Sequence, residues 1–357
     1  MPLCTLHLLA LTRPSPVSAS ASNPTDSADS ADSDSDPVPP FLTTLLRAIN
    51  NNNEKEKIKP LTIARPLRWI VTPSAPPSRH LPAAHQWDLL LILPATATSS
   101  SSSAAQLPSP LLDPRLVAAR WSVTFGVPGR VLRGYEGRNE GLLRGPAANA
   151  GAGGGDDVPA VEEAAAAAAT AAAAAVGGGG GAGAGGAGGV GRLASSAQGL
   201  ELSGELMDWV REVGRGGGGG GGAVSMLNLL AFRDGMKGEY LKYGKAFAED
   251  VGRRWGGVAK IVGTVVEDGG GRGVGVGNDG GGGGGEEGEK RVWDEVALAH
   301  YPSIWHFAGM LASEDYQAVN QRHRVGSLKD TFILCTTELG LPGGDCDGKE
   351  GRAAAKL

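Results

Sequence analysis

The most informative single residue is Asn228, an amide inside the mostly apolar stretch AVSMLNLLAF at residues 223–232. An earlier stretch, LHLLAL at residues 6–11, carries His7 at the matching place. A polar side chain on a buried strand is costly unless it is hydrogen-bonded. Asn228 and His7 are therefore predicted to follow one of two patterns. Either they line a small cavity between sheets and contact a ligand, or they bond a neighbouring backbone group or a water inside the fold.

A second candidate is His323, which shares one helical stripe with Tyr316 and Val319. A histidine that faces a cavity mouth could act as a general base near neutral pH. The alternative is a half-buried structural histidine near the end of a helix. Arg322 and Arg324 flank His323, and one of them would pair with an acid such as Asp294 or bind an anionic ligand, unless both stay in solvent.

The carboxylates Asp88 and Asp294 each follow a tryptophan, in QWD and VWD. A carboxylate that recurs in this way is either a base or an edge-strand charge that anchors a turn. Tyr243 either contacts a ligand or packs as a core aromatic. The candidate catalytic residues are thus His323 and Asp294, and the candidate ligand-binding residues are Asn228, His7, Tyr243 and Arg322.

Other catalytic signatures are absent from the sequence. No close set of His, Asp and Glu has a metal-ligand spacing, so neither a metal site nor a cofactor is expected. The stretch GVGVGNDG at residues 273–280 does not stand between a strand and a helix, so it is no dinucleotide fingerprint. No P-loop, no G-x-S-x-G and no H-E-x-x-H occurs. These residues leave open whether the chain is an enzyme.

Composition narrows the class of protein. The 357 residues include 58 glycines and 22 prolines, so much of the chain cannot contribute to a core. The net charge of −5 gives no general attraction to nucleic acid. The three cysteines are too few for a disulfide scaffold and fit a reducing compartment. No apolar run is long enough to cross a bilayer, so we expect a soluble, cytoplasmic protein without a membrane or nucleic-acid partner.

The elements that must position these residues are clearest in the second half of the chain. Their order is β-α-β-β-α-β, the ferredoxin-like arrangement. The predicted strands are 224–232, 258–267, 291–301 and 331–337. The predicted helices cover 238–255 and then begin at Ser303 and at Ser313, where Ser313 is a suitable N-cap. An added amphipathic helix is predicted over 198–213, with Ser203 as its cap.

The first half repeats this order more weakly. Its predicted strands are 5–11, 61–72, 86–94 and 120–127. Its predicted helices are 41–49 and 110–120, although Pro114 allows the second helix only from about that residue onward. Pro66 inside the second strand indicates an edge or a bulge.

Low-complexity segments separate these parts, because they lack the apolar content that would offset ordering entropy. Residues 1–145 are predicted to form a degenerate ferredoxin-like repeat with a disordered loop at 15–40. Residues 146–197 form a disordered linker. Residues 198–341 form the second repeat, with a disordered loop at 268–289, and 342–357 form a disordered tail.

Four blocks of the second half resemble the domain of unknown function 1330 family, within the dimeric α/β-barrel superfamily. They are MLNLLAF (226–232), EYLKYG (239–244), VWDEVALAHYPS (292–303) and MLASEDYQAVNQRHRVGSLKDT (310–331). The first half is similar through LHLLAL, QWD and its element order alone. The resemblance implies that two ferredoxin-like units pair through their sheets. Two units in one chain then imply a monomer with an internal pseudo-dimer, an α+β intramolecular dimeric α/β barrel.

Function follows only in outline. The chain is expected to bind a small apolar molecule in a pocket between sheet and helices. The resemblance adds cofactor-independent monooxygenase-like or isomerase-like chemistry as one interpretation. The alternative is a non-catalytic binding or scaffold protein on the same fold, because a fold does not determine a function.

Overall fold

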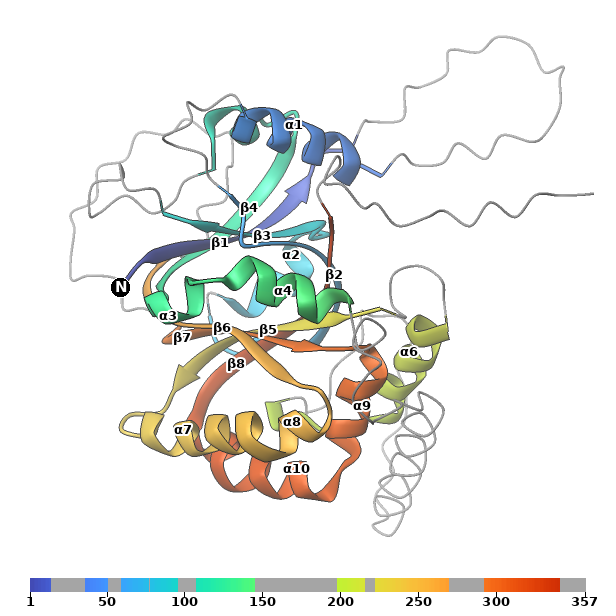
Figure 1. Ribbon diagram of the computed structural model, residues 1–357, viewed down its shortest axis with the longest axis vertical. Helices are drawn as coiled ribbons and strands as arrows, with labels where there is room; N and C mark the ends of the chain where they lie inside the picture. Colours follow the sequence, from blue (N-terminus) through green and yellow to red (C-terminus); the bar gives the residue numbers. More distant parts are fainter. Residues whose placement is uncertain are drawn as a thin grey trace, which may run out of the picture.

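The computed structural model describes residues 1–13, 36–50, 59–76, 78–95, 107–144, 198–215, 222–269 and 292–340. Most of the predicted disordered segments, including 146–197 and 342–357, lie outside these residues. The described strands form one closed antiparallel barrel in the order β1-β3-β2-β8-β5-β7-β6-β4 (Figure 1). The strands are Leu3–Leu11 (β1), Thr62–Val71 (β2), Leu89–Pro94 (β3), Val117–Gly126 (β4), Val224–Phe232 (β5), Val258–Gly269 (β6), Glu295–Tyr301 (β7) and Leu328–Glu338 (β8).

The predicted fold class, two ferredoxin-like repeats that form a dimeric α/β barrel, is wrong. Backbone pairing joins the two halves, β2 with β8 and β4 with β6, so their strands make a single barrel wall. In the first half, moreover, no helix covers the predicted 110–120. Ser109–Leu112 is a 3₁₀ turn (η3), and β4 begins at Val117. Prolines on both sides of that turn leave little room for a continuous helix.

The helices lie outside the barrel (Figure 1). The α-helices are Val38–Asn50 (α1), Leu81–Ala84 (α2), Gly129–Leu132 (α3), Tyr135–Arg144 (α4), Gly204–Arg215 (α6), Lys237–Ala246 (α7), Gly252–Arg254 (α8), Ile304–Ala312 (α9) and Glu314–Val319 (α10). Two π-helical turns follow α7 and α10, at Phe247–Val251 (η6) and Asn320–Arg324 (η7). Within the described part of the chain, no helix is long and apolar enough to cross a membrane.

Strand alternation divides the core into an inner and an outer part. On β5, Leu227 and Leu229 belong to the cluster that fills the barrel, whereas Met226 and Leu230 belong to a cluster under the outer helices. Inside the barrel, Phe332 makes edge-on contacts with Trp69, Trp121 and Trp293. Large side chains fill the interior of the barrel, and a cavity lies between the second-half strands and the helices that cover them.

Several local predictions are confirmed. Ser203 and Ser313 cap α6 and α10, since their Oγ atoms accept hydrogen bonds from the backbone N–H of Leu206 (3.1 Å) and Tyr316 (3.3 Å). The register of β2 against β8 shifts just after Pro66, as expected for a bulge. β2 is paired on both sides, so it is no edge strand.

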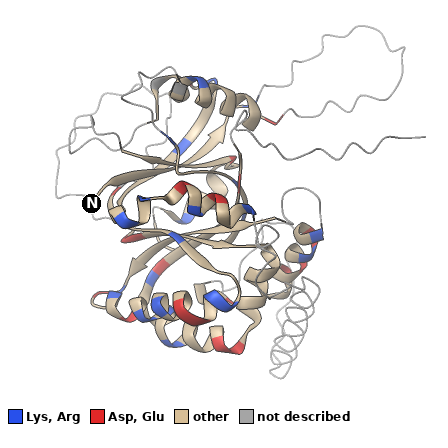
Figure 2. Ribbon diagram, in the orientation of Figure 1, with Lys and Arg blue, Asp and Glu red and all other residues tan. Residues whose placement is uncertain are grey.

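Charged residues of both signs are interspersed on α4 and α7, while the barrel strands carry few (Figure 2). This distribution agrees with a surface made by the helices and a core made by the strands.

Candidate functional site

A cavity of about 280 Å³ lies between the outer face of the second-half strands and the helices α7, α9 and α10. Its apolar lining includes Met226, Phe247, Ala297, Ala299, Phe307 and Met310. Its polar lining includes Asn228, Tyr240, Tyr243, Glu295, Tyr301 and Tyr316. The cavity is therefore an apolar space with a few polar groups, the usual form of a small-molecule site.

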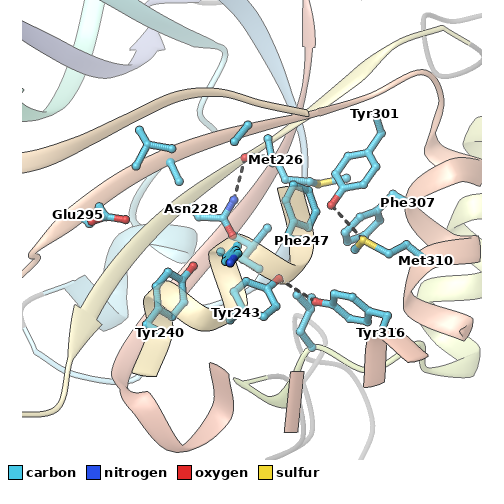
Figure 3. A pocket seen from close by; sticks show the side chains of 18 of the residues that line it. Met226, Asn228, Tyr240, Tyr243, Phe247, Glu295, Tyr301, Phe307, Met310 and Tyr316 are labelled. Carbon is cyan, nitrogen blue, oxygen red and sulfur yellow. Dashed lines mark hydrogen bonds between the residues drawn. The ribbon is translucent and has the colours of Figure 1, made fainter. Parts of the chain in front are cut away.

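Asn228 lies on β5 and lines this cavity. Its Nδ2 donates a hydrogen bond to the carbonyl oxygen of Met226 (2.9 Å), whereas no hydrogen bond to its Oδ1 is found among the described residues. In Figure 3 the amide faces Tyr240 and Tyr243. Asn228 thus both donates a hydrogen bond to the backbone and lines a cavity, features that the sequence alone presents as alternatives. The expected place between sheets is wrong, because the cavity lies outside the barrel.

Four tyrosines line the cavity (Figure 3). Tyr240, Tyr243 and Tyr316 lie on the helices opposite Asn228, whereas Tyr301 lies on β7, in the same sheet as Asn228. The hydroxyls of Tyr243 and Tyr316 lie 3.2 Å apart, and that of Tyr301 donates to the sulfur of Met310 (3.5 Å). Burial raises the pKa of Tyr240 and of the other three above the ordinary value of 10.0. They therefore stay protonated near neutral pH and can donate hydrogen bonds.

Glu295 is the acidic side chain of the cavity wall. It opposes Leu230 in the register of β5 with β7, while Asn228 opposes Ala297, so Glu295 and Asn228 are diagonal neighbours on one face. Burial raises the pKa of the Glu295 carboxyl, and Lys237, whose Nζ lies 3.3 Å from it, acts in the opposite direction. Glu295 is therefore the carboxyl of the cavity wall that could accept a proton, although it is already paired with Lys237.

Irregular backbone surrounds the cavity. Phe247, which lines it, begins the π-helical turn η6, and such turns often occur at functional sites. Leu200, also in the lining, has a left-handed backbone with a φ of 55°. Side chains of the α10 region hold this segment: Asn320 donates to the Gly199 carbonyl (2.6 Å) and Gln317 to that of Leu200 (3.3 Å). These hydrogen bonds maintain the left-handed backbone of Leu200 at a position where its residue lines the cavity.

His323 does not line the cavity. The π-helical turn at Asn320–Arg324 shifts the helical stripe, so Arg324 is buried, while the side chain of His323 is 21% exposed. His323 Nδ1 lies 2.5 Å from a carboxylate oxygen of Glu239. Lys242 first, and then His323, lowers the pKa of Glu239. Arg322 is exposed on the same turn, so neither residue joins Asn228.

Asp88 and Asp294 have matching structural contacts. Asp88 accepts a hydrogen bond from the backbone N–H of Leu11 (2.7 Å), and Asp294 accepts one from that of Phe232 (2.8 Å). Each carboxylate therefore fixes the end of a strand, which agrees with the turn-anchor interpretation. Asp294 also lines a second hollow of about 340 Å³, together with Arg233 and other residues outside the first cavity.

The two remaining ligand-binding candidates, His7 and Tyr243, lie in different places. His7 is buried on β1, in the other half of the barrel, where its Nδ1 lies 2.7 Å from Ser122 Oγ. Tyr243 lines the cavity with Asn228. The structure thus brings together Asn228 and Tyr243, while His7, Asp294, Arg322 and His323 lie elsewhere.

Sequence reasoning missed a polar cluster within the barrel wall. Lys260 Nζ binds a carboxylate oxygen of Glu338, and both side chains are almost fully buried. Burial lowers the pKa of Lys260, and Glu338 opposes this shift. Burial, followed by the charge of Lys260, lowers the pKa of His300 to about 4. The available signal was one lysine inside the apolar run VAKIVGTVVE, and Glu295 stands out in the same way in VWDEVALAHY.

Among the residues that the structure describes, no group of three or more His, Cys, Asp or Glu could hold a metal ion. Cys4 and Cys335 are buried free thiols, and burial raises the pKa of Cys4 to about 12. Neither cysteine is suited to act as a nucleophile.

No family model and no curated protein matches the chain. Among solved structures, a protein of unknown function from Rhodopseudomonas palustris is similar at 22% sequence identity. The match covers 39% of this chain and 96% of that chain, with a TM-score of 0.26. A likeness this weak carries no argument. The resemblance to the domain of unknown function 1330 family stays a prediction.

Proposed function

We propose that this chain binds a small, largely apolar molecule in the cavity between the barrel and the helices α7, α9 and α10. The observation that carries the proposal is the Asn228 amide, which lies on a strand whose other side chains in the lining are apolar, in a cavity that also has Lys245 and four tyrosines in its wall. Its Oδ1 accepts no hydrogen bond from the described residues, although it faces the cavity. Asn228 is half-buried, and a ligand that carries a hydroxyl or N–H group would give this acceptor a partner when the ligand displaces water from the cavity.

The volume limits the size of the ligand. An apolar cavity of roughly 150 Å³ in another protein holds benzene. The 280 Å³ measured here therefore suits a molecule of about two fused rings. The wall of tyrosine, phenylalanine and methionine side chains favours a flat or aromatic body.

A catalytic role is the second candidate. Cofactor-independent monooxygenase-like or isomerase-like chemistry would need a proton acceptor, and the observation that favours it is the raised pKa of Glu295. The carboxyl is also ion-paired with Lys237, which holds it away from free proton exchange. Binding is therefore the stronger proposal. A non-catalytic scaffold role, in a monomer whose low-complexity segments meet partners, remains the alternative.

Isothermal titration with 2-naphthol tests the proposal. We expect the full-length chain to bind it, and Ala297→Leu, which fills the cavity, to weaken binding by about tenfold or more. Ala248→Leu on the exposed face of η6 is the matched control and should bind as the wild type does. Unchanged binding by Ala297→Leu would contradict the proposal.

A further inference from the structure

Arg324 is a buried cation without an acidic partner in the described part of the chain. The residue is 1% exposed, and its Nη2 has no hydrogen-bond partner there. Its Nη1 donates to the carbonyl oxygen of Gln198 (3.1 Å). An arginine keeps its charge in proteins, so this guanidinium is a positive charge held away from water.

The buried carboxylate of Asp330, which shares Gln198 as a hydrogen-bond partner with Arg324, already accepts several hydrogen bonds. Asp330 accepts hydrogen bonds from the backbone N–H groups of Ser74 and Ala75, from the Ser74 hydroxyl and from the Gln198 amide. It forms no ion pair with Arg324 within 4.0 Å in the described residues. The charge of Arg324 is therefore not neutralised by direct contact.

The positive charge acts on the tyrosine wall of the cavity. The turn that carries Arg324, η7, packs against α7, which supplies Tyr240 and Tyr243. The guanidinium favours the ionised form of all four tyrosines of the lining. An anion placed beside these hydroxyls would experience the same attraction, which is strong where water is excluded.

We propose that the ligand of the cavity is a cyclic or aromatic carboxylic acid, bound as its carboxylate at the tyrosine wall beside Arg324. This inference rests on the proposed function and narrows its ligand class. The tyrosine hydroxyls donate hydrogen bonds to the carboxylate, and the apolar body lies against Met226 and Phe307.

The acid already in the wall does not oppose this arrangement. Glu295 is paired with Lys237, so the two side chains are together close to neutral. Glu295 also lies on β7, whereas Arg324 follows α10. Arg324 itself does not line the cavity, so the guanidinium would attract a carboxylate at the tyrosine wall across a short distance and not by direct contact.

The test compares two ligands of nearly equal shape, 2-naphthoate and neutral 2-naphthamide, by isothermal titration of the full-length chain. We expect naphthoate to bind about tenfold more tightly or better, and 2-naphthol to compete with it. Equal or weaker binding of naphthoate overturns the inference, while binding of naphthamide and 2-naphthol alone would leave the proposed function intact. If none of the three binds, both fail.

Two variants test whether the charge of Arg324 causes the preference for naphthoate over naphthamide. Arg324→Met keeps an unbranched side chain and removes the charge, so naphthoate should lose its advantage over naphthamide. Arg322→Met, two residues away and exposed, makes the same change in net charge and should preserve the advantage. An advantage that survives Arg324→Met would overturn the inference. If Arg324→Met does not fold, the ratio of the two ligands on the wild-type chain decides the question.

Discussion

Asn228 shows how one residue can have both a structural and a binding role. Half of its amide bonds the backbone of Met226, and the other half faces the cavity. The sequence was sufficient to select this residue, because an amide in an apolar strand is conspicuous. It could not tell which side of the barrel wall the amide would face, since that depends on which face the helices cover.

Replacing Asn228 should change ligand preference more than it changes stability. We expect wild-type protein to bind 2-naphthol about fivefold more tightly than naphthalene, as one hydrogen bond contributes about 1 kcal/mol. Asn228→Leu, of similar volume, should abolish this preference in isothermal titration. A preference that persists in Asn228→Leu would show that the hydroxyl bonds another group.

Asp294 should contribute to stability through the strand end that it fixes. Asp294→Ala leaves the N–H of Phe232 without its carboxylate acceptor, and we expect the free energy of unfolding to fall by about 2 kcal/mol in urea titrations. Asp234→Ala, at an exposed neighbouring position, should change it by less than about 0.5 kcal/mol. Equal effects of the two substitutions would argue against the anchoring role.

His300 should make the protein sensitive to mild acid. Its pKa is about 4 in the fold against an ordinary 6.5, so the unfolded chain takes up the proton first as pH falls. The contribution of His300 to stability is therefore complete above about pH 7.5 and should fall by about 2 kcal/mol between that pH and pH 5. Urea titrations at several pH values measure this slope.

His300→Gln removes the titrating group and should flatten that slope. His85→Gln, at an exposed position, serves as the control and should retain it. An unchanged slope in His300→Gln would assign the acid sensitivity to other groups.

At the scale of elements, most strands could be predicted, and one helical register could not. The strand predicted over 224–232 coincides with β5. The stripe that joined Tyr316 to His323 assumed a regular α-helix, whereas the π-helical turn η7 adds backbone there and buries Arg324 instead. A regular helical period in the sequence cannot reveal such a turn, which in the structure packs against α7.

The cap of α10 offers a test at this scale. Ser313 Oγ accepts a hydrogen bond from the N–H of Tyr316 and donates one to the Met310 carbonyl (3.0 Å). Ser313→Ala should lower the free energy of unfolding by about 1 kcal/mol, and Ser313→Thr should recover most of the loss. Failure of threonine to recover stability would assign the effect to something other than the cap.

For the whole molecule, the sequence located most strands along the chain, but the arrangement predicted from it, two ferredoxin-like repeats paired as a dimeric α/β barrel, is wrong, because the described strands form one closed antiparallel barrel. Closure depends on β2 meeting β8 and β4 meeting β6, contacts between residues far apart in the chain. Gly263 lies where β6 meets β4. A Cβ there would lie 2.6 Å from the carbonyl oxygen of Gly126 on β4. The absence of a side chain allows the two strands to approach.

Gly263→Ala should therefore weaken the barrel as a whole. We expect the free energy of unfolding to fall by about 2 kcal/mol, with faster amide exchange on β4 and β6. Gly326→Ala, where an added Cβ meets nothing within 4 Å, is the control and should change stability little. Similar losses in both variants would mean that the closure tolerates a side chain.

The most direct test of the binding proposal is crystallographic. Crystals of the full-length chain soaked in 6-bromo-2-naphthol would locate the ligand through the anomalous signal of bromine. The proposal predicts one strong peak between β7 and α9, with the naphthol oxygen within hydrogen-bonding distance of Asn228 Oδ1. A peak confined to another site, or no peak in crystals saturated with the compound, would contradict it.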